Sequence, residues 1–307
     1  MGMRLRRRDF LKTAGPAVIV GAGLAGAPNV SALAAGPTAE NDKSPRLFVG
    51  CCAYSYGKPL EAKKMTMEDF IRTGVDLRVD GVDMTAYWFK STDPAYLAEL
   101  RHLAFKNGIC FSGAATGAST VQADAAKRAD VLAEIKKWID VTDALGAPHL
   151  RVFAGKLPKG ATIEQGIAWT VETLKPACEY AGNKGITLGM EDHDGVTQNA
   201  DTCLEIVRQV NSPFFGINLD ITHYIPTAKA DAYAQMEATV AYATHTHIRD
   251  KFDDGTPIDL DRAWQIFAKA GYKGFMSAEY EGAEDPMTGV PKLIDKIRTL
   301  CRKYSTV

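Results

Sequence analysis

Beyond residue 46, short apolar runs alternate eight times with longer amphipathic segments. The apolar runs are rich in Val, Ile, Phe and Tyr, which is typical of buried strands. The longer segments have a 3.6-residue period; in 123–145, for example, Val131, Ile135 and Ile139 share one helix face. Eight β-α units in about 265 residues predict a single-domain (β/α)8 TIM barrel, with a doubly wound α/β sheet as the alternative.

The boundaries of these elements follow from turn sequences such as Asn107-Gly108 and Asn211-Ser212-Pro213, which lie between a helix and the next strand. Strands are predicted at Leu47–Tyr54, Gly81–Trp88, Ile109–Ala114, His149–Ala154, Ile186–Glu191, Phe214–Asp220, Ala243–Ile248 and Gly274–Glu279. Helices are predicted near 67–78, 94–107, 123–145, 163–183, 200–210, 229–241, 260–270 and 287–304.

Composition excludes several classes of protein. The chain is 46% hydrophobic and 24% charged, which is typical of a globular protein and excludes disorder. Its 36 basic and 37 acidic residues nearly cancel, so we expect no nucleic-acid partner. Six cysteines in 307 residues are too few for a disulfide scaffold. The neighbouring Cys51 and Cys52 lie inside an apolar run, and we expect them to be buried free thiols.

The first 34 residues have the features of a cleavable export signal. Basic residues precede an uncharged stretch over 13–35, which contains the small-residue sequence Ala32-Leu33-Ala34. The order Arg7-Arg8-x-Phe10-Leu11-Lys12 resembles a twin-arginine signal. We therefore expect a signal peptide over 1–34, a flexible segment over 35–46 and the barrel over 47–307, with the twin-arginine export machinery as a partner and a periplasmic location. A permanent membrane anchor is the alternative, but its glycines and prolines would make a poor helix.

One motif in this segment is misleading. Gly21-Ala22-Gly23-Leu24-Ala25-Gly26 fits the G-x-G-x-x-G pattern of dinucleotide-binding sites, but that pattern has meaning only between a strand and a helix. Pro28 follows almost at once, so we do not expect nucleotide binding. Without residues 1–34 the chain has 31 bases and 36 acids, a net charge of −5, which argues further against a nucleic-acid partner.

Polar side chains cluster where the last four predicted strands end, and active sites of such barrels lie at those ends. Three carboxylates and an imidazole from adjacent strands would form a mixed oxygen and nitrogen site, which suits Mn²⁺, Mg²⁺ or Co²⁺ better than a cysteine-rich zinc site. Salt bridges or helix caps are the alternative. The relevant segments are Glu191-Asp192-His193-Asp194-Gly195, Asn218-Leu219-Asp220-Ile221-Thr222-His223, His245-Thr246-His247-Ile248-Arg249-Asp250-Lys251 and Ser277-Ala278-Glu279-Tyr280-Glu281-Gly282.

These four segments resemble the xylose isomerase-like TIM barrel family, over roughly residues 47–300. The family includes sugar isomerases and epimerases, hydroxypyruvate isomerase and inosose dehydratases. The resemblance implies one divalent metal, for which we expect Mn²⁺, with Mg²⁺, Co²⁺ and Zn²⁺ as alternatives. Its implied ligands are Glu191, Asp220, His247 and Glu279.

The resemblance also implies roles in catalysis and substrate binding. Glu191 and Glu279 match the acid/base pair of the epimerases. His223 matches a substrate-contacting histidine, Arg249 matches the usual Lys or Arg after the metal histidine, and His193 lies where the family often has E-N-H. With a cation stabilising charge on the substrate carbonyl oxygen, one carboxylate would remove the adjacent proton and a second group would return it.

Two departures from the family narrow these expectations. Ketose epimerases have a further glutamate six residues after the first metal ligand, and Thr197 stands there instead, which argues against a free ketohexose as substrate. The apurinic endonuclease branch needs additional histidines that this chain lacks, so we do not expect a DNA-repair enzyme.

Tyr54 and Trp88 close the first two predicted strands, where they would either stack on a sugar ring or pack at the rim.

A sugar isomerase or epimerase is the expected function. The alternatives are an exported lyase or hydrolase acting on 3-keto-glycosides by the same proton abstraction, and a non-catalytic sugar-binding protein. The sequence leaves the sugar and the oligomeric state undetermined.

Overall fold

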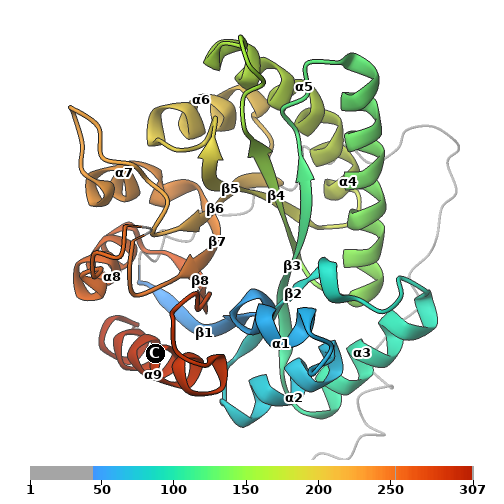
Figure 1. Ribbon diagram of the computed structural model, residues 1–307, viewed down its shortest axis with the longest axis vertical. Helices are drawn as coiled ribbons and strands as arrows, with labels where there is room; N and C mark the ends of the chain where they lie inside the picture. The colour runs from blue at the N-terminus through green and yellow to red at the C-terminus, as the bar shows by residue number, and fades with distance from the viewer. Residues whose placement is uncertain (1–43, 253, 306–307) are drawn as a thin grey trace, which may run out of the picture. The chain divides into compact units, whose positions relative to one another are not determined.

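The computed structural model describes residues 44–252 and 254–305, and these form a closed barrel of parallel strands in sequential order. Helices surround the barrel on its outer side (Figure 1). The prediction of a TIM barrel is therefore confirmed. The export signal predicted over 1–34 and most of the segment predicted over 35–46 lie outside the described residues. The strands are β1 (Arg46–Cys52), β2 (Gly81–Thr85), β3 (Cys110–Ser119), β4 (His149–Gly155), β5 (Thr187–Gly195), β6 (Phe215–Asp220), β7 (Ala243–Ile248) and β8 (Lys273–Ala278).

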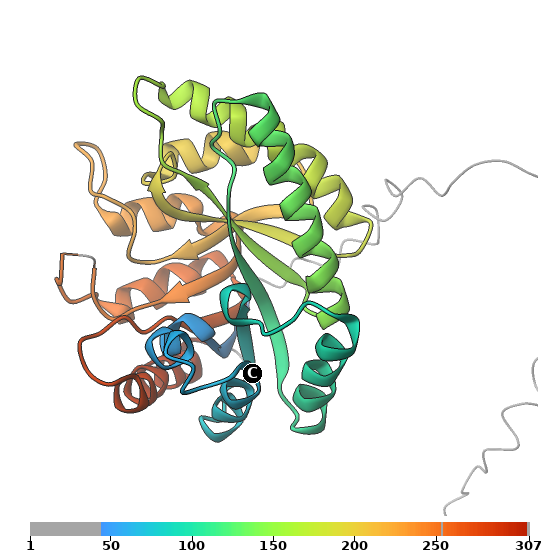
Figure 2. The ribbon, with the colours of Figure 1, turned by 45° about the vertical axis from the view of Figure 1, so that its right-hand side comes forward.

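The helices follow the strands along the chain and cover the outside of the barrel (Figure 2). In the part of the chain that the structure describes, short 3₁₀ helices lie at Ala53–Tyr56, Ala86–Trp88 and Val240–Tyr242. The α-helices are α1 (Gly57–Glu61), α2 (Met67–Asp76), α3 (Pro94–Lys106), α4 (Ala125–Leu145), α5 (Ile163–Gly182), α6 (Ala200–Val210), α7 (Ala232–Thr239), α8 (Leu260–Ala270) and α9 (Pro286–Tyr304).

Local sequence accounts for where these helices begin and end. Thr66 and Thr162 start α2 and α5 with capping boxes, in which the threonine side chain and the side chain three residues later satisfy each other's backbone N–H groups. Gly146 and Gly271 end α4 and α8 in the left-handed conformation, which glycine adopts without strain.

Alternation along the strands separates an apolar layer from a polar barrel interior. In β4 and β5, Leu150, Val152, Leu188 and Met190 are fully buried in the hydrophobic core. The residues next to them in the sequence have the opposite orientation, and two of these, Arg151 and Glu191, meet inside the barrel. Charged side chains of several strands therefore share one enclosed space.

The first two strands end earlier than predicted. Strands were expected to continue to Tyr54 and Trp88, but β1 ends at Cys52 and β2 at Thr85, and the aromatic residues lie in 3₁₀ helices. Aromatic residues favour strands locally, but at the rim the chain must leave the barrel, and this requirement overrides the propensity. The Cys52 sulfur accepts a hydrogen bond from the backbone N–H of Tyr54 and so caps the first of these turns.

Other boundaries also differ from the prediction. β3 and β5 continue beyond their predicted ends, to Ser119 and Gly195, because Ser119 pairs with Phe153 and Gly195 with Gly155 after register shifts. His193 consequently lies within β5. Helix α7 is shorter than the predicted 229–241, and its end continues as a 3₁₀ helix.

Two further properties concern the chemistry of the chain. All six cysteines are free, and Cys51 and Cys52 are buried, as predicted. Within residues 44–252 and 254–305, no helix combines the length and the apolar character needed to cross a membrane.

Candidate metal centre and substrate pocket

The four side chains singled out at the last strands converge at one end of the barrel. Glu191 belongs to β5, Asp220 ends β6, His247 belongs to β7, and Glu279 directly follows β8. Parallel strands bring their carboxyl ends to the same rim, and the register aligns Asp220 with His247. All four side chains are buried, and one potential ligand atom from each lies within 4.8 Å of the others.

The imidazole of His247 lies at the centre of this group. Its Nδ1 is 2.8 Å from Oε1 of Glu191 and 3.3 Å from Oε1 of Glu279. The second oxygen of Glu191 is 3.1 Å from Nε of Arg151. The carboxylates of Glu191 and Glu279 therefore converge on one nitrogen. The guanidinium of Arg151 contacts the other oxygen of Glu191 and compensates its negative charge.

Asp220 has its own set of partners. Its carboxylate accepts hydrogen bonds from the backbone N–H and the hydroxyl of Thr222, and Nη2 of Arg249 lies 3.3 Å from Oδ2. Its backbone N–H donates to Oδ1 of the buried Asp192, at 2.7 Å. These contacts hold the Asp220 side chain in one orientation toward the cluster.

The carboxyl groups of the cluster have unequal proton affinities. Burial raises the pKa of Glu279 to about 7, because the positive charge of His247 does not outweigh burial and the nearby negative charges of Glu191 and Asp220. Burial acts in the same direction on Glu191, but Arg151 and His247 outweigh it and lower the pKa of that group. For Asp220, His223 and Arg249 outweigh burial, and its pKa is also lowered.

The donor set fits a hard divalent cation. It offers three carboxylates and one imidazole in a buried space, and oxygen-rich ligation of this kind suits Mn²⁺, Mg²⁺ or Co²⁺. Burial is the main cause of the raised pKa of Glu279, and a bound cation would stabilise the ionised form of this carboxylate. This buried Glu/Asp/His cluster is consistent with a divalent metal site.

A pocket of about 450 Å³ opens directly onto the cluster. Glu191 and Glu279 form part of its floor, so a ligand in the pocket would reach both carboxylates. The rest of the lining comes from the barrel interior and from its rim: Tyr54, Tyr87, Arg151, Phe153, His193, Asp194, Gln198, His223, Ile225, Arg249 and Glu281.

The predicted substrate-binding residues His193, His223 and Arg249 lie together in this pocket. The rings of His193 and His223 meet edge to face, with 4.3 Å between their centroids. Nδ1 of His223 is 3.0 Å from the backbone oxygen of Asp192, and its Nε2 contacts Nη2 of Arg249. Thr197, which stands in place of the epimerase glutamate, is buried and accepts a hydrogen bond from the backbone N–H of His193.

The two predicted aromatic residues occupy different positions. Tyr54 lines the pocket and is 40% exposed, so its ring is accessible to a ligand. Trp88 packs against Tyr54 with 5.7 Å between ring centroids, but it lines the adjoining surface groove rather than the pocket itself. Tyr54 therefore lines the pocket above the cluster, whereas Trp88 is separated from the pocket by the side chain of Tyr54.

Sequence reasoning missed three buried charged residues of this site: Asp83, Arg151 and Asp192. Arg151 pairs with Glu191, Asp83 is 3.0 Å from Nε2 of His247, and Asp192 holds the Asp220 backbone. A signal was available for Asp83 and Arg151, because each lies in a strand between two buried apolar residues, where an unpaired charge would be costly. Their partners could not be read from the sequence.

The fold and the site define a (β/α)8 barrel with a buried acidic and histidine cluster beneath an open pocket. The family model described as "Xylose isomerase-like TIM barrel" matches residues 73–300. The chain belongs to this family.

Individual relatives are distant. A putative hydroxypyruvate isomerase from Mus musculus is 24% identical over 162 residues, which are 48% of this chain and 58% of the relative, so the match spans little more than half of that protein. A D-psicose 3-epimerase from Clostridium cellulolyticum H10, solved with D-tagatose, has a TM-score of 0.67 at 17% identity and covers 84% of this chain and 98% of its own. A 3-keto-D-glucoside 4-epimerase from E. coli has a TM-score of 0.67 at 13% identity, covering 83% and 99%. At such identities these structures show a shared fold.

Proposed function

We propose that this protein is a divalent-metal-dependent sugar isomerase or epimerase that works by proton transfer next to a carbonyl group. The observation that carries the proposal is the buried group of Glu191, Asp220, His247 and Glu279 on the floor of an open pocket. These four residues would hold one cation, and Mn²⁺ is the metal we expect from their oxygen-rich donor set. When bound, the cation would stabilise negative charge developing on the substrate's carbonyl oxygen.

The chain's own side chains would carry out the proton transfer. Glu191 and Glu279 both face the pocket, and both approach the same nitrogen of His247, so a substrate carbon above them would lie within reach of either. One carboxylate would remove the proton next to the carbonyl, and the other would return a proton to the neighbouring carbon or to the opposite face. His193, His223 and Arg249 would contact the substrate hydroxyls from the rim.

The charges of the pocket favour a neutral sugar over a phosphorylated one. Arg151 pairs with Glu191, and Arg249 lies 3.3 Å from Asp220 and 3.5 Å from Glu281, so both arginines of the lining have acidic partners. Four carboxylates line the pocket against these two cations: Glu191, Asp194, Glu279 and Glu281. Adding Asp220 of the cluster and Lys156, which is 3.2 Å from Asp194, gives five carboxylates against three cations. A divalent cation would bring this balance to neutrality and leave no surplus positive charge to bind a phosphate group.

A lyase acting on a 3-keto-glycoside is the second candidate. It would begin with the same proton abstraction and end with loss of the substituent on the adjacent carbon. A substituted sugar has room here, because Tyr54 lines both the pocket and a neighbouring groove, which Trp88 also lines. The name of the E. coli relative, a 3-keto-D-glucoside 4-epimerase, is in line with a substrate of this kind.

We also propose that the protein is exported by the twin-arginine route, on the basis of the Arg7-Arg8-x-Phe10-Leu11-Lys12 sequence and the uncharged stretch that follows. Because that route carries folded proteins, the metal centre could be completed before export. A periplasmic location would in turn be in line with a neutral sugar as the substrate.

Incubation of the Mn²⁺-loaded protein with neutral keto sugars and 3-keto-glycosides in deuterated water, followed by NMR, tests the proposal. An isomerase or epimerase yields a rearranged sugar of unchanged composition that has incorporated deuterium. A lyase yields two products, and a binding protein yields line broadening without deuterium incorporation. If no sugar in such a screen exchanges its proton, the catalytic proposal is wrong.

A further inference from the structure

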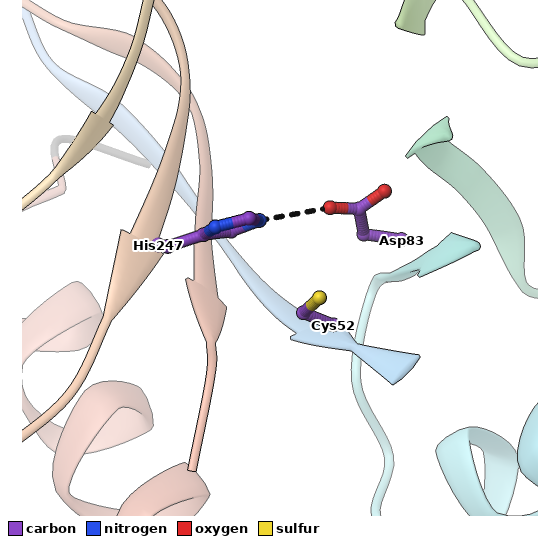
Figure 3. A group of neighbouring side chains, drawn as sticks. All are labelled: Cys52, Asp83 and His247. Atoms are coloured by element: carbon purple, nitrogen blue, oxygen red, sulfur yellow. Dashed lines mark hydrogen bonds and ion pairs between the residues drawn. The ribbon is translucent and has the colours of Figure 1, made fainter. Parts of the chain in front are cut away.

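A second group of side chains adjoins the metal cluster on the far side of His247. It consists of Cys52 from β1, Asp83 from β2 and His247 itself, and all three are buried. Figure 3 shows the imidazole of His247 extending from β7 toward the carboxylate of Asp83, with Cys52 beside them. Cys52 and Asp83 are register partners in the barrel, so they lie at the same depth.

The two nitrogens of His247 face different environments. Nδ1 is directed at Glu191 and Glu279 of the metal cluster, whereas Nε2 is 3.0 Å from Oδ2 of Asp83. The imidazole is fully buried, so a flip of the ring would exchange both sets of contacts. The nitrogen available to a metal therefore depends on what the other nitrogen binds.

Asp83 has no other hydrogen-bonding role that the structure records for its side chain. Among the described residues, the side chain of Asp83 makes one hydrogen bond, from Oδ2 to His247, and Oδ1 is buried without a hydrogen-bond partner. A buried carboxylate with a single partner is costly in an apolar strand, and β2 has no other charged residue. The hydrogen bond to His247 therefore accounts for the presence of a carboxylate at this position in β2.

We propose that Asp83 is a positioning residue that orients His247 for metal binding. Its carboxylate accepts the Nε2–H of the imidazole and leaves the Nδ1 lone pair directed at the space between Glu191, Asp220 and Glu279. Carboxylates that hold the distal N–H of a ligand histidine fix its tautomer and raise its basicity. The inference rests on the metal centre of the proposed function, but it does not depend on which sugar is the substrate.

A second metal between Cys52, Asp83 and Nε2 of His247 is the competing explanation. The thiol is engaged within the protein: it accepts from the backbone of Tyr54 and lies 3.8 Å from Oε1 of Glu279, a distance suited to an S–H donor. The separation of 3.0 Å between Nε2 and Oδ2 is that of a direct hydrogen bond. These contacts favour the positioning role over a second ion.

Titration of the metal-free, full-length protein with Mn²⁺ tests the proposal without any sugar. We expect Asp83→Asn to bind Mn²⁺ about 10- to 100-fold more weakly, with one equivalent still bound at saturation. The matched control is Asp80→Asn, three residues earlier in the chain, whose carboxylate accepts a hydrogen bond from the backbone N–H of Val49 and does not belong to the metal cluster, and its affinity should equal that of the wild type. Wild-type affinity in a folded Asp83→Asn variant would overturn the proposal.

A measurement on the wild-type protein keeps the proposal testable if Asp83→Asn does not fold. In protein with labelled histidines and loaded with an NMR-active cadmium isotope, the nitrogen that couples to cadmium identifies the ligand atom. We expect this coupling at Nδ1 of His247, with a proton on Nε2. Coupling at Nε2, or a thiolate-to-metal charge-transfer band after loading with Co²⁺, would show the second-ion arrangement and overturn the positioning role.

The outcomes separate this proposal from the proposed function. A wild-type protein that binds no divalent metal would overturn the metal centre and the positioning role together. Normal metal binding without proton exchange from any sugar would overturn the enzymatic proposal and leave the role of Asp83 intact.

Discussion

Arg151 and Glu191 form an ion pair inside the barrel, with 3.1 Å between Nε of the arginine and Oε2 of the glutamate. Both side chains are buried, and they lie on the neighbouring strands β4 and β5. The guanidinium thus supplies positive charge beside a carboxylate that is also a candidate metal ligand. Loss of one partner of such a pair leaves the other charge buried and uncompensated.

Arg151→Met should therefore destabilise the metal-free protein by roughly 3–5 kcal/mol. Saturating Mn²⁺ should recover part of this loss, because a bound cation would neutralise Glu191. Urea unfolding with and without metal measures both effects. Arg72→Met is the control, since its pair with Asp69 is about half exposed and should be worth roughly 0–1 kcal/mol. A metal-free Arg151→Met protein as stable as the wild type would contradict the importance of this pair.

Metal removal should lower the stability of the wild-type protein. Elemental analysis of protein purified without chelators should find about one equivalent of divalent metal, and Mn²⁺ at one hundred times its dissociation constant should stabilise the fold by about 2.7 kcal/mol. Asp220→Ala should abolish this stabilisation. Asp194→Asn, a partly exposed carboxylate at the rim, should retain it. If the melting temperature of the wild type does not respond to Mn²⁺ or to any other divalent cation, the metal centre is refuted.

Metal affinity should rise with pH up to a little above neutrality. The pKa of Glu279 in the metal-free protein is raised to about 7, mainly by burial, so this group is protonated below that pH. A metal ligand must be ionised, and binding at pH 6 should therefore release a proton, whereas binding at pH 8 should release fewer. Calorimetry in buffers of different ionisation enthalpy measures the number of protons released on metal binding. Proton release that does not change between these pH values would show that Glu279 is ionised throughout.

Glu279→Gln should keep the fold while losing proton exchange between substrate and solvent. The amide is isosteric but cannot act as a base, and loss of a general base typically costs on the order of 10²–10⁴ in rate. Glu284→Gln is the control, because Glu284 lies in the loop after β8 and pairs with the surface residue Lys292. A Glu279→Gln variant with wild-type metal content and wild-type turnover would assign this carboxylate to metal binding alone.

Export should depend on the arginine pair at the start of the chain. Replacing Arg7 and Arg8 by lysine preserves the charge but removes the twin-arginine sequence. A folded reporter fused behind residues 1–40 should then remain in the cytoplasm, whereas the unaltered sequence should carry it to the periplasm. Equal export of both fusions would exclude this route.

The sequence by itself determined the architecture and the positions where the chemistry lies. Eight alternations of strand and helix predict a barrel, because parallel strands joined by helices need a helical layer over the sheet and eight such units are the number that closes a barrel. The rule that strand ends meet at one rim then predicted that the polar ends of the last four strands lie together, and the family resemblance selected Glu191, Asp220, His247 and Glu279 among them. This information is local or follows from chain order.

The tertiary structure decided which charges pair and where the first two strands end. Asp83 and His247 are 164 residues apart in the chain and meet across the barrel, and no pattern within either segment encodes that contact. The same holds for Arg151 and Glu191, whose pairing depends on the register of β4 and β5. Barrel closure sets these distances, because it brings the inward-facing side chains of strands that are distant in the sequence into one enclosed interior. The aromatic turns after Cys52 and Thr85 have the same origin, since the rim forces the chain to leave the sheet where local propensity would have continued it.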